Sequence, residues 1–311
     1  MSTININNYS ILNMKTSILV TFLCISISIY AQEGKMVDND QQFLDFLENS
    51  LESDTVNDET AKNFHQRSMA YWKEHIYDYN LHPEKYDIAL SLFYQNQQKY
   101  KQNNSIKIDR YKDVIDNFCR FDNRNTLAKN PILFIGSSSI VHWETSLAFP
   151  EFPIINRGFG GASLPEIIHY YDDIIKKHSP SIMVVYCDID IERGKSPREA
   201  VNSFKELVSK VKKDFPKTQI ILLSMKPTLI DDFLGKDVHR NKIITNTKLS
   251  EYCNDEKNLH YIDITNPMLK SDDSLRSDIF LSDGMHLNPL GYTLWNPVVR
   301  EEIAALTKQK E

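Results

Sequence analysis

The chain has 311 residues, of which 41% are apolar, 25% charged and 11% aromatic, so it can bury a substantial core. Nine glycines and twelve prolines are too few for a collagen-like or low-complexity protein, and no repeat with a period of about 20 to 50 residues occurs. The net charge of -6, without a long Lys/Arg block, disfavours nucleic-acid binding.

The first 31 residues have the pattern of a signal peptide that starts at Met14 or earlier. Lys15 precedes an apolar run at residues 18–30, which is short for a membrane span of about 20 residues, and Ala31 suits the position before a cleavage site. We therefore expect a secreted or periplasmic protein, with residues 1–31 removed and no membrane span after cleavage. An uncleaved N-terminal anchor is the alternative.

The cysteines indicate neither a lipid anchor nor a disulfide framework. Leu23 stands where a small residue would precede a lipidated Cys24. Cleavage would leave Cys119, Cys187 and Cys253, an odd number without close spacing. Neither C-x-x-C nor H-E-x-x-H occurs, so we expect no metal and no cofactor.

Residues 32–108 are expected to form an all-helical N-terminal extension. Apolar side chains recur at helical spacing, for example at Phe43, Phe46 and Leu47, without strand alternation. We predict a helical layer outside the sheet of the domain that follows, with a separate binding module as the alternative.

Residues 109–311 are expected to form an α/β domain. After Asn130, apolar runs lie at residues 131–135, 153–155, 182–186, 219–223 and 260–262, and helical patterns at residues 164–177, 197–214 and 238–253. Such runs, separated by amphipathic helices, indicate strands buried on both faces of a parallel sheet. We predict a three-layer α/β/α fold with a central sheet of about five strands, and functional residues at the carboxyl ends of the strands.

Four segments hold the residues that could carry chemistry: Gly136–Ile140, Asn156–Gly161, Tyr186–Asp190 and Ser282–Asn288. In this order on an α/β framework they resemble the SGNH/GDSL hydrolase superfamily, in its secreted esterase and lipase-like branch. The resemblance runs from about Tyr111 to the C-terminus. Its most specific parts are ILFIGSSSIVHW, INRGFGGAS and FLSDGMHLNPLGYTLW, which are similar to the first, second and fifth blocks of that family. It implies a flavodoxin-like fold and hydrolysis of carboxylic esters.

The resemblance implies a catalytic triad of Ser138, Asp283 and His286. A serine hydroxyl needs a base to take its proton, and an imidazole titrates close enough to neutrality to act as that base and then as the acid. A carboxylate fixes the tautomer of the imidazole and stabilises its cation. No G-x-S-x-G pentapeptide occurs, which disfavours the ordinary α/β-hydrolase elbow.

The resemblance also implies an oxyanion hole formed by the backbone N–H groups of Ser138 and Gly161 and by a third-block asparagine. Each donor contributes about 3 kcal/mol to transition-state stabilisation. Gly158 and Gly160 are expected to serve the tight loop. A dinucleotide site is disfavoured, because Ser163 stands where a last glycine would complete G-x-G-x-x-G.

The third block departs from the family pattern, which is approximately Tyr-Ala-Gly-X-Asn-Asp. Alignment on the downstream Gly-Lys-Ser-Pro segment puts Ile189 at the asparagine position, whereas alignment on Tyr186 puts Asp190 there. Neither residue supplies an amide donor, and an ionised carboxylate would repel the oxyanion. The loss corresponds to about a hundredfold in rate. Asp188, Ile189 and Asp190 are the candidate replacements.

Two functions are open on the sequence alone. The first is a secreted serine esterase that removes a short acyl group, with acetyl on a carbohydrate as the favoured case, from a small ester or acylated saccharide. The second is a catalytically impaired relative that binds an acylated glycan or lipid. No feature of the sequence indicates the oligomeric state, and fold and triad do not define the acyl or alcohol group.

Some neighbouring residues are expected to be structural. Trp143 and Trp295 are interpreted as core or pocket-wall aromatics, and Cys187 as a small buried side chain. Asn156 is expected to brace the second-block loop, and Asn288 to cap or fasten the segment with the triad aspartate and histidine.

Overall fold

The computed structural model describes residues 40–100 and 108–308, so the predicted signal peptide lies outside the described residues. By internal contacts the described residues divide into two compact units: residues 40–64 with 86–100, here the helical unit, and residues 65–85 with 108–308, here the sheet unit. The functional boundaries expected after residues 31 and 108 stay predictions, because these units are defined by contacts alone.

The helical unit is built around aromatic side chains at helical spacing. Its described helices cover residues 40–52, the start of α2 (Asp58–Leu81) and α3 (Asp87–Lys99). The ring centroid of Phe64 lies 6.1 Å from that of Phe46, 5.8 Å from that of Phe93 and 5.2 Å from that of Tyr100. Aromatic pairs at these separations add to the area that they bury, so this cluster holds the three helical segments together.

The sheet unit contains a five-stranded parallel sheet in the order β2-β1-β3-β4-β5, which confirms the predicted fold class. The strands are β1 (Ile132–Gly136), β2 (Ile154–Asn156), β3 (Ile182–Tyr186), β4 (Gln219–Leu223) and β5 (Leu259–Ile262). Every residue of β1 and β3 is buried, as expected for strands covered on both faces.

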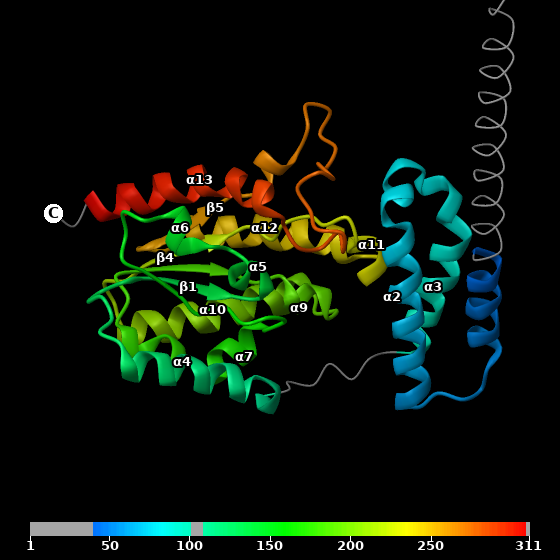
Figure 1. Cartoon of the computed structure of the whole chain (residues 1–311), viewed down its shortest axis with the longest axis horizontal. Helices are drawn as coiled ribbons and strands as arrows, with labels where there is room; N and C mark the ends of the chain where they lie inside the picture. Colours follow the sequence, from blue (N-terminus) through cyan, green and yellow to red (C-terminus); the bar gives the residue numbers. More distant parts are fainter. Residues whose placement is uncertain (1–39, 101–107, 309–311) are drawn as a thin grey trace, which may run out of the picture. The chain divides into compact units, whose positions relative to one another are not determined.

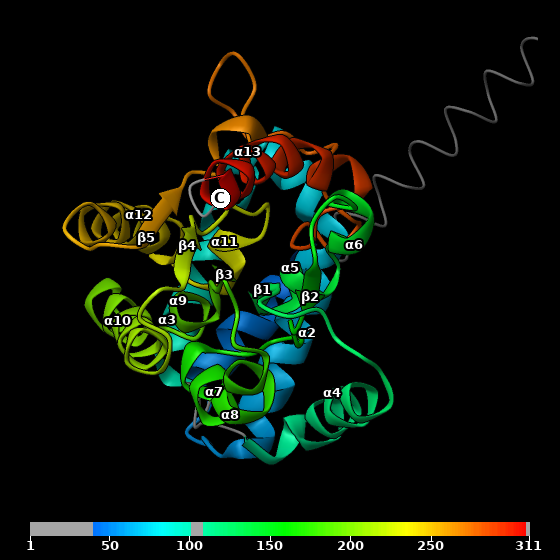
Figure 2. The same ribbon diagram turned by 90° about the vertical axis from the view of Figure 1, so that its left-hand side faces the viewer.

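Helices cover both faces of the sheet, which gives the three layers (Figures 1 and 2). The α-helices after α3 are α4 (Lys112–Arg124), α5 (Ser138–Val141), α6 (Thr145–Ala148), α7 (Leu164–His169), α8 (Tyr171–Ile174), α9 (Ile189–Glu192), α10 (Pro197–Asp214), α11 (Asp231–Leu234), α12 (Val238–Asn254) and α13 (Pro289–Lys308). Short 3-10 helices are η1 (Pro83–Tyr86), η2 (Ile108–Tyr111), η3 (Lys176–His178) and η4 (Asn266–Met268). None of the described helices is long and apolar enough to cross a membrane.

The two faces of the sheet have different cores. On one face, buried side chains such as Leu133 and Val185 pack against α4, α7, α8, α10 and α12. On the other face, Phe134 contacts Trp143, and Tyr186 contacts Trp295 of α13, with ring centroids 5.4 and 5.6 Å apart. The alternation of side chains along each strand sends successive residues to opposite layers.

The strand order creates a topological switch point at the carboxyl edge of the sheet. From β1 the chain first adds β2 on one side and then β3 on the other, so the loops after β1 and β3 diverge. Such switch points are where open α/β sheets bind ligands. The register pairs Gly136 with Tyr186, so the residues just beyond these strand ends become neighbours.

Residues 65–85 of the predicted extension belong to the sheet unit. The ring of Trp72 stacks on that of Phe233 at 4.2 Å, and the Tyr79 hydroxyl donates to the Asp232 carboxylate at 2.6 Å. Trp72 is fully buried. Helical periodicity predicts that this segment is helical, but it does not show which surface the helix covers.

Candidate active site

Ser138 lies directly beyond the end of β1, as the first residue of α5. Gly136 permits this turn, because a Cβ atom at that position would lie 2.0 Å from the carbonyl oxygen of Tyr186 on the adjacent strand. As the first residue of a helix, Ser138 has a backbone N–H without an intrahelical acceptor. The hydroxyl and this N–H therefore start at the same strand end.

Asp283 organises the loop that carries His286. Its Oδ1 accepts hydrogen bonds from the backbone N–H groups of Met285 at 2.9 Å and His286 at 3.0 Å. Asn288 fastens the end of the loop as expected: its side-chain amide donates to the Asp278 carbonyl oxygen at 2.8 Å, and its Oδ1 accepts from Gly291 N–H at 3.1 Å. The loop is thus held from both ends before α13 begins.

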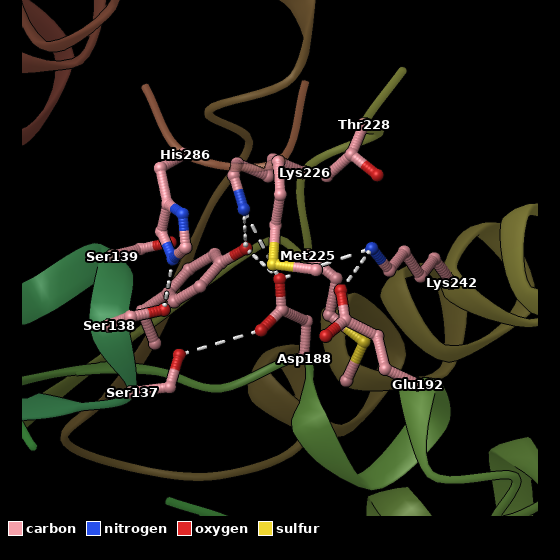
Figure 3. A network of polar contacts seen from close by, with 12 residues as sticks. Ser137, Ser138, Ser139, Asp188, Glu192, Met225, Lys226, Thr228, Lys242 and His286 are labelled. Carbon is pink, nitrogen blue, oxygen red and sulfur yellow. Dashed lines mark hydrogen bonds and ion pairs between the residues drawn. The ribbon is translucent and has the colours of Figure 1, made fainter. Parts of the chain in front are cut away.

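The three residues of the expected triad come together in one hydrogen-bonded chain (Figure 3 shows the pair of Ser138 and His286). The Ser138 hydroxyl lies 2.9 Å from Nε2 of His286, and Nδ1 of His286 lies 2.7 Å from Oδ2 of Asp283. With the proton on Nδ1, the imidazole donates to the carboxylate and accepts from the serine. This is the arrangement in which a serine hydroxyl can transfer its proton as it attacks.

The Asp283 carboxylate, which ends this series of hydrogen bonds, is held in its ionised form. Partial burial opposes ionisation of Asp283, but the hydrogen bonds from the His286 ring and from two backbone N–H groups keep its pKa below the ordinary value. The ring of His142 lies 4.9 Å from that of His286, and partial burial together with that neighbour lowers the pKa of His142. Asp283 is therefore the negative partner that can stabilise a protonated His286.

The second-block loop packs directly on α5. A Cβ atom on Gly158 would lie 2.7 Å from the Ile140 side chain, whereas one on Gly160 would meet no atom within 4 Å, so close packing requires only the first of these glycines. The Asn156 amide braces the loop as expected, donating to the Ile140 carbonyl oxygen at 2.8 Å. Gly161 has a φ of +74°, and its carbonyl oxygen accepts from the Tyr111 hydroxyl at 2.7 Å.

The third block brings Asp188, rather than Ile189 or Asp190, toward the serine loop. Oδ1 of Asp188 accepts from the Ser137 hydroxyl at 3.5 Å. Ile189 packs against the core, and Asp190 accepts from Leu164 N–H at 3.0 Å. Both sequence alignments therefore select a residue, Ile189 or Asp190, whose side chain makes other contacts. The third-block side chain that lies next to the serine loop is the carboxylate of Asp188.

The Asp188 carboxylate belongs to a buried charge network. Its members are Asp188, Glu192, Lys226, Asp231 and Lys242 (Figure 3 labels all of these except Asp231). The amine of Lys226 lies 3.4 Å from Oδ2 of Asp188. The amine of Lys242 lies 2.8 Å from Asp231 and 2.9 Å from Glu192. The sequence analysis did not predict a role for either lysine, because neither lies in a motif. The signal that could have indicated Lys226 is its position shortly after a predicted strand.

A cavity of about 810 Å³ lies on the α12 side of this network. Asp231 and Lys242 line it, together with Met225, His239 and Tyr261. None of the three triad residues is among its lining residues. The cavity therefore borders the charge network and not the Ser138 hydroxyl.

The structural interpretations of the nearby residues are confirmed. Trp143 and Trp295 are buried, and the indole N–H of Trp143 donates to the Asn296 side chain at 2.8 Å. Cys187 is buried with its sulfur 3.4 Å from the Ala162 carbonyl oxygen, and burial raises the pKa of its thiol well above the usual range. Cys187 is thus not an activated nucleophile.

The chain thus has a five-stranded parallel sheet with a serine at its carboxyl edge, and it lacks the G-x-S-x-G elbow of the ordinary α/β-hydrolases. Residues 139–294 match the model of the GDSL-like lipase/acylhydrolase family. The chain belongs to this family, and the predicted superfamily is confirmed.

Solved structures show the same fold. A GDSL-like lipase from Bacteroides thetaiotaomicron is 17% identical, with a TM-score of 0.53, and the alignment covers 65% of this chain and 98% of that one. A Bacteroides fragilis protein described as an acylhydrolase is 18% identical, with a TM-score of 0.54, and the alignment covers 68% of this chain and all of that one. No curated protein matches the chain.

Proposed function

We propose that this chain is a serine ester hydrolase in which Ser138 is the nucleophile, His286 the general base and acid, and Asp283 the residue that orients His286. The observation that carries the proposal is the continuous hydrogen-bonded chain from the serine hydroxyl through the imidazole to the carboxylate, at 2.9 and 2.7 Å. Family membership supports ester hydrolysis as the class of reaction.

The reaction follows from these contacts. The Ser138 oxygen attacks the ester carbonyl carbon as its proton passes to Nε2 of His286. The tetrahedral intermediate then expels the alcohol, which takes that proton from His286, and leaves an acyl group on the serine. A water molecule repeats the two steps and releases the acid. Asp283 stabilises the imidazolium at both stages.

The oxyanion is expected to lie near the backbone N–H groups of Ser138 and Gly161. Each such donor contributes about 3 kcal/mol when it points at the developing charge. The N–H of Gly161 has no acceptor among the described residues. Two donors instead of three correspond to a slower enzyme, not to an inactive one.

The proposed substrate is a small ester with a short acyl group, such as an acetylated saccharide, and the proposed compartment is outside the cytoplasm. The mildly acidic chain and the secretion signal read from residues 1–31 support a neutral extracytoplasmic substrate. The part of the chain that the structure describes holds no candidate metal cluster, and the proposed steps use the three side chains, two backbone N–H groups and a water molecule.

The test is hydrolysis of p-nitrophenyl acetate by the wild-type chain and by Ser138→Ala. We expect measurable turnover that falls by at least about a thousandfold in the variant, since residual rates without a triad serine come from binding alone. Ser139→Ala, next in the chain and buried, is the matched control and should retain turnover. Equal rates for wild type and Ser138→Ala would instead support a protein that binds acylated glycans or lipids without hydrolysing them.

A further inference from the structure

An ionised Asp188 beside the proposed nucleophile would repel the tetrahedral intermediate, because that intermediate is an anion. The Asp188 side chain is 4% exposed and accepts from the hydroxyl of Ser137, the residue immediately before the proposed nucleophile. Because Gly136 and Tyr186 are paired, residues 138 and 188 extend from neighbouring strand ends. Adjacent strands are about 4.8 Å apart, so an uncompensated charge on Asp188 would act on the oxyanion at short range.

We infer that Lys226 is a positioning residue that forms a buried ion pair with Asp188 and so, in a site without the third-block amide, offsets the charge that this carboxylate would otherwise place beside the forming oxyanion. The inference rests on the proposed esterase function. It concerns the electrostatics of the site, because Lys226 acts through Asp188 and the catalytic steps stay with the triad.

The geometry of Lys226 fits this role. The side chain is 1% exposed, and its amine lies 3.4 Å from Oδ2 of Asp188 and 3.3 Å from the Tyr186 hydroxyl. The same hydroxyl donates to Oδ2 of Asp188 at 2.5 Å, and the amine lies 5.5 Å from the centroid of the tyrosine ring. Figure 3 shows the Lys226 and Asp188 side chains between those of His286 and Glu192. A lysine buried to this extent requires such partners.

The other lysine of the network has different partners. Lys242 lies 3.9 Å from Asp188 but 2.8 Å from Asp231 and 2.9 Å from Glu192, so those two closer carboxylates already outnumber its single positive charge. Burial opposes ionisation of Asp188, yet Lys226, then Lys242 and the Tyr186 hydroxyl, hold its pKa below the ordinary value. Asp188 is therefore ionised, and Lys226 is the cation available to neutralise it.

The same block contains a matched control pair. Lys195 lies 2.5 Å from Asp190, and Asp190 accepts from Leu164 N–H, on the side of the block that faces α7. This pair also joins an aspartate of the third block to a lysine, but no contact links it to Ser137 or Ser138 among the described residues. Lys195→Met should therefore leave turnover and ligand binding unchanged.

The experiment compares Lys226→Met, Asp188→Asn, their combination and Lys195→Met in the full-length chain. Steady-state hydrolysis of p-nitrophenyl acetate gives kcat and KM. Binding of phenylboronic acid gives a readout that needs no turnover: the serine oxygen adds to the trigonal boron, its proton passes to His286, and the boron becomes a tetrahedral anion. Circular dichroism and thermal unfolding show whether each variant is folded.

We expect Lys226→Met to lower kcat by about tenfold or more, with KM changed by less than about threefold, because charge on the carbonyl oxygen develops only in the transition state. Boronate affinity should fall by a similar factor. Asp188→Asn in the same chain should restore both values to within about threefold of wild type, since it removes the uncompensated charge. A merely structural role of Lys226 predicts no such recovery in the double variant.

The inference is overturned if Lys226→Met keeps wild-type kcat and boronate affinity, or if the double variant is as impaired as Lys226→Met. If Lys226→Met does not fold, Asp188→Asn alone decides: values at or above wild type support the inference, and a fall of about tenfold in both overturns it. A wild-type chain that binds boronate but hydrolyses no ester would refute the proposed function, while the boronate series still tests Lys226. A wild-type chain that does neither refutes both proposals.

Discussion

At the scale of single residues, Asp283 has two separable tasks, and an amide in its place should preserve one of them. Asp283→Asn keeps an oxygen that can accept from Met285 and His286 N–H groups, so the loop should stay folded. Its NH₂ group would face Nδ1 of His286 and favour the tautomer that cannot accept the serine proton. We expect kcat for p-nitrophenyl acetate to fall between about 100-fold and 10,000-fold, with KM little changed.

The control for that variant is Asp278→Asn, because Asp278 lies on the same segment, pairs with Arg276 at 2.7 Å and is 56% exposed on its side chain. It should retain wild-type kcat, since exposed pairs contribute little. A kcat of Asp283→Asn within about threefold of wild type would show that another group orients His286.

The convergence of Ser138, Asp283 and His286 was predictable from the sequence, whereas the charge network was not, for a physical reason. Ser138, Asp283 and His286 lie in short segments whose residue types and spacing are tied to one chemistry. Lys226 is one lysine among many, and its proposed role depends on its burial beside Asp188, which lies 38 positions away in the sequence. Burial and partner are tertiary properties, so local pattern could show that an amide was missing but not which side chain lies beside the resulting carboxylate.

At the scale of elements, the loop at residues 283–286 depends on Gly284. This glycine has a φ of +63°, and a Cβ atom on it would lie 2.0 Å from Cδ1 of Ile76 and 3.1 Å from Cβ of Leu229. Gly284→Ala would combine left-handed backbone strain with displacement of Ile76. We expect a loss of about 2 kcal/mol in the free energy of unfolding, measured in urea, and a lower kcat because His286 shifts.

Gly194→Ala separates the effect of backbone strain from the effect of the contact with Ile76. Gly194 has a φ of +87°, but a Cβ atom there would meet nothing within 4 Å. It should show the backbone strain alone, about 1 kcal/mol, with unchanged kcat. If Gly284→Ala is no more destabilising than Gly194→Ala, the contact with Ile76 does not hold the loop.

Most strands and helices were predicted to within one residue. The helical pattern at residues 197–214 coincides with α10, and the pattern at residues 238–253 ends one residue before α12 does. The apolar runs at residues 182–186 and 219–223 coincide with β3 and β4, because buried parallel strands leave a continuous apolar signal. The single helix expected over residues 164–177 is divided into α7, α8 and η3, although its apolar positions are buried as the pattern indicates. Helical periodicity identifies the buried face; it does not show where the backbone changes direction.

At the scale of the whole molecule, stability should depend on a partly buried cluster away from Ser138, formed by Asp122, Arg157, Lys177 and His178. Arg157 and Lys177 both pair with Asp122, and Nε2 of His178 lies 3.6 Å from the same carboxylate. The cluster links α4, the end of β2 and η3. His178 has 2% of its side chain exposed, so a proton added to it would have no access to water.

Burial, with the charge of Arg157 and then of Lys177, lowers the pKa of His178 to about 4, although Asp122 opposes the shift. In the unfolded chain a histidine takes up its proton near pH 6.5. Between about pH 6.5 and pH 4 the unfolded state therefore binds a proton that the folded state excludes, and the free energy of unfolding falls as the pH falls. One group can contribute a slope of at most about 1.4 kcal/mol per pH unit.

We expect His178→Gln to flatten this part of the stability curve relative to wild type, as measured by urea unfolding at half-unit steps from pH 7 to about pH 4. The difference between the two curves isolates His178 from the carboxylates that titrate at lower pH. His82→Gln, at a histidine with 49% of its side chain exposed, should leave the slope unchanged. Parallel curves for wild type and His178→Gln would mean that His178 accepts its proton equally well in both states, and that the cluster opens before the protein unfolds.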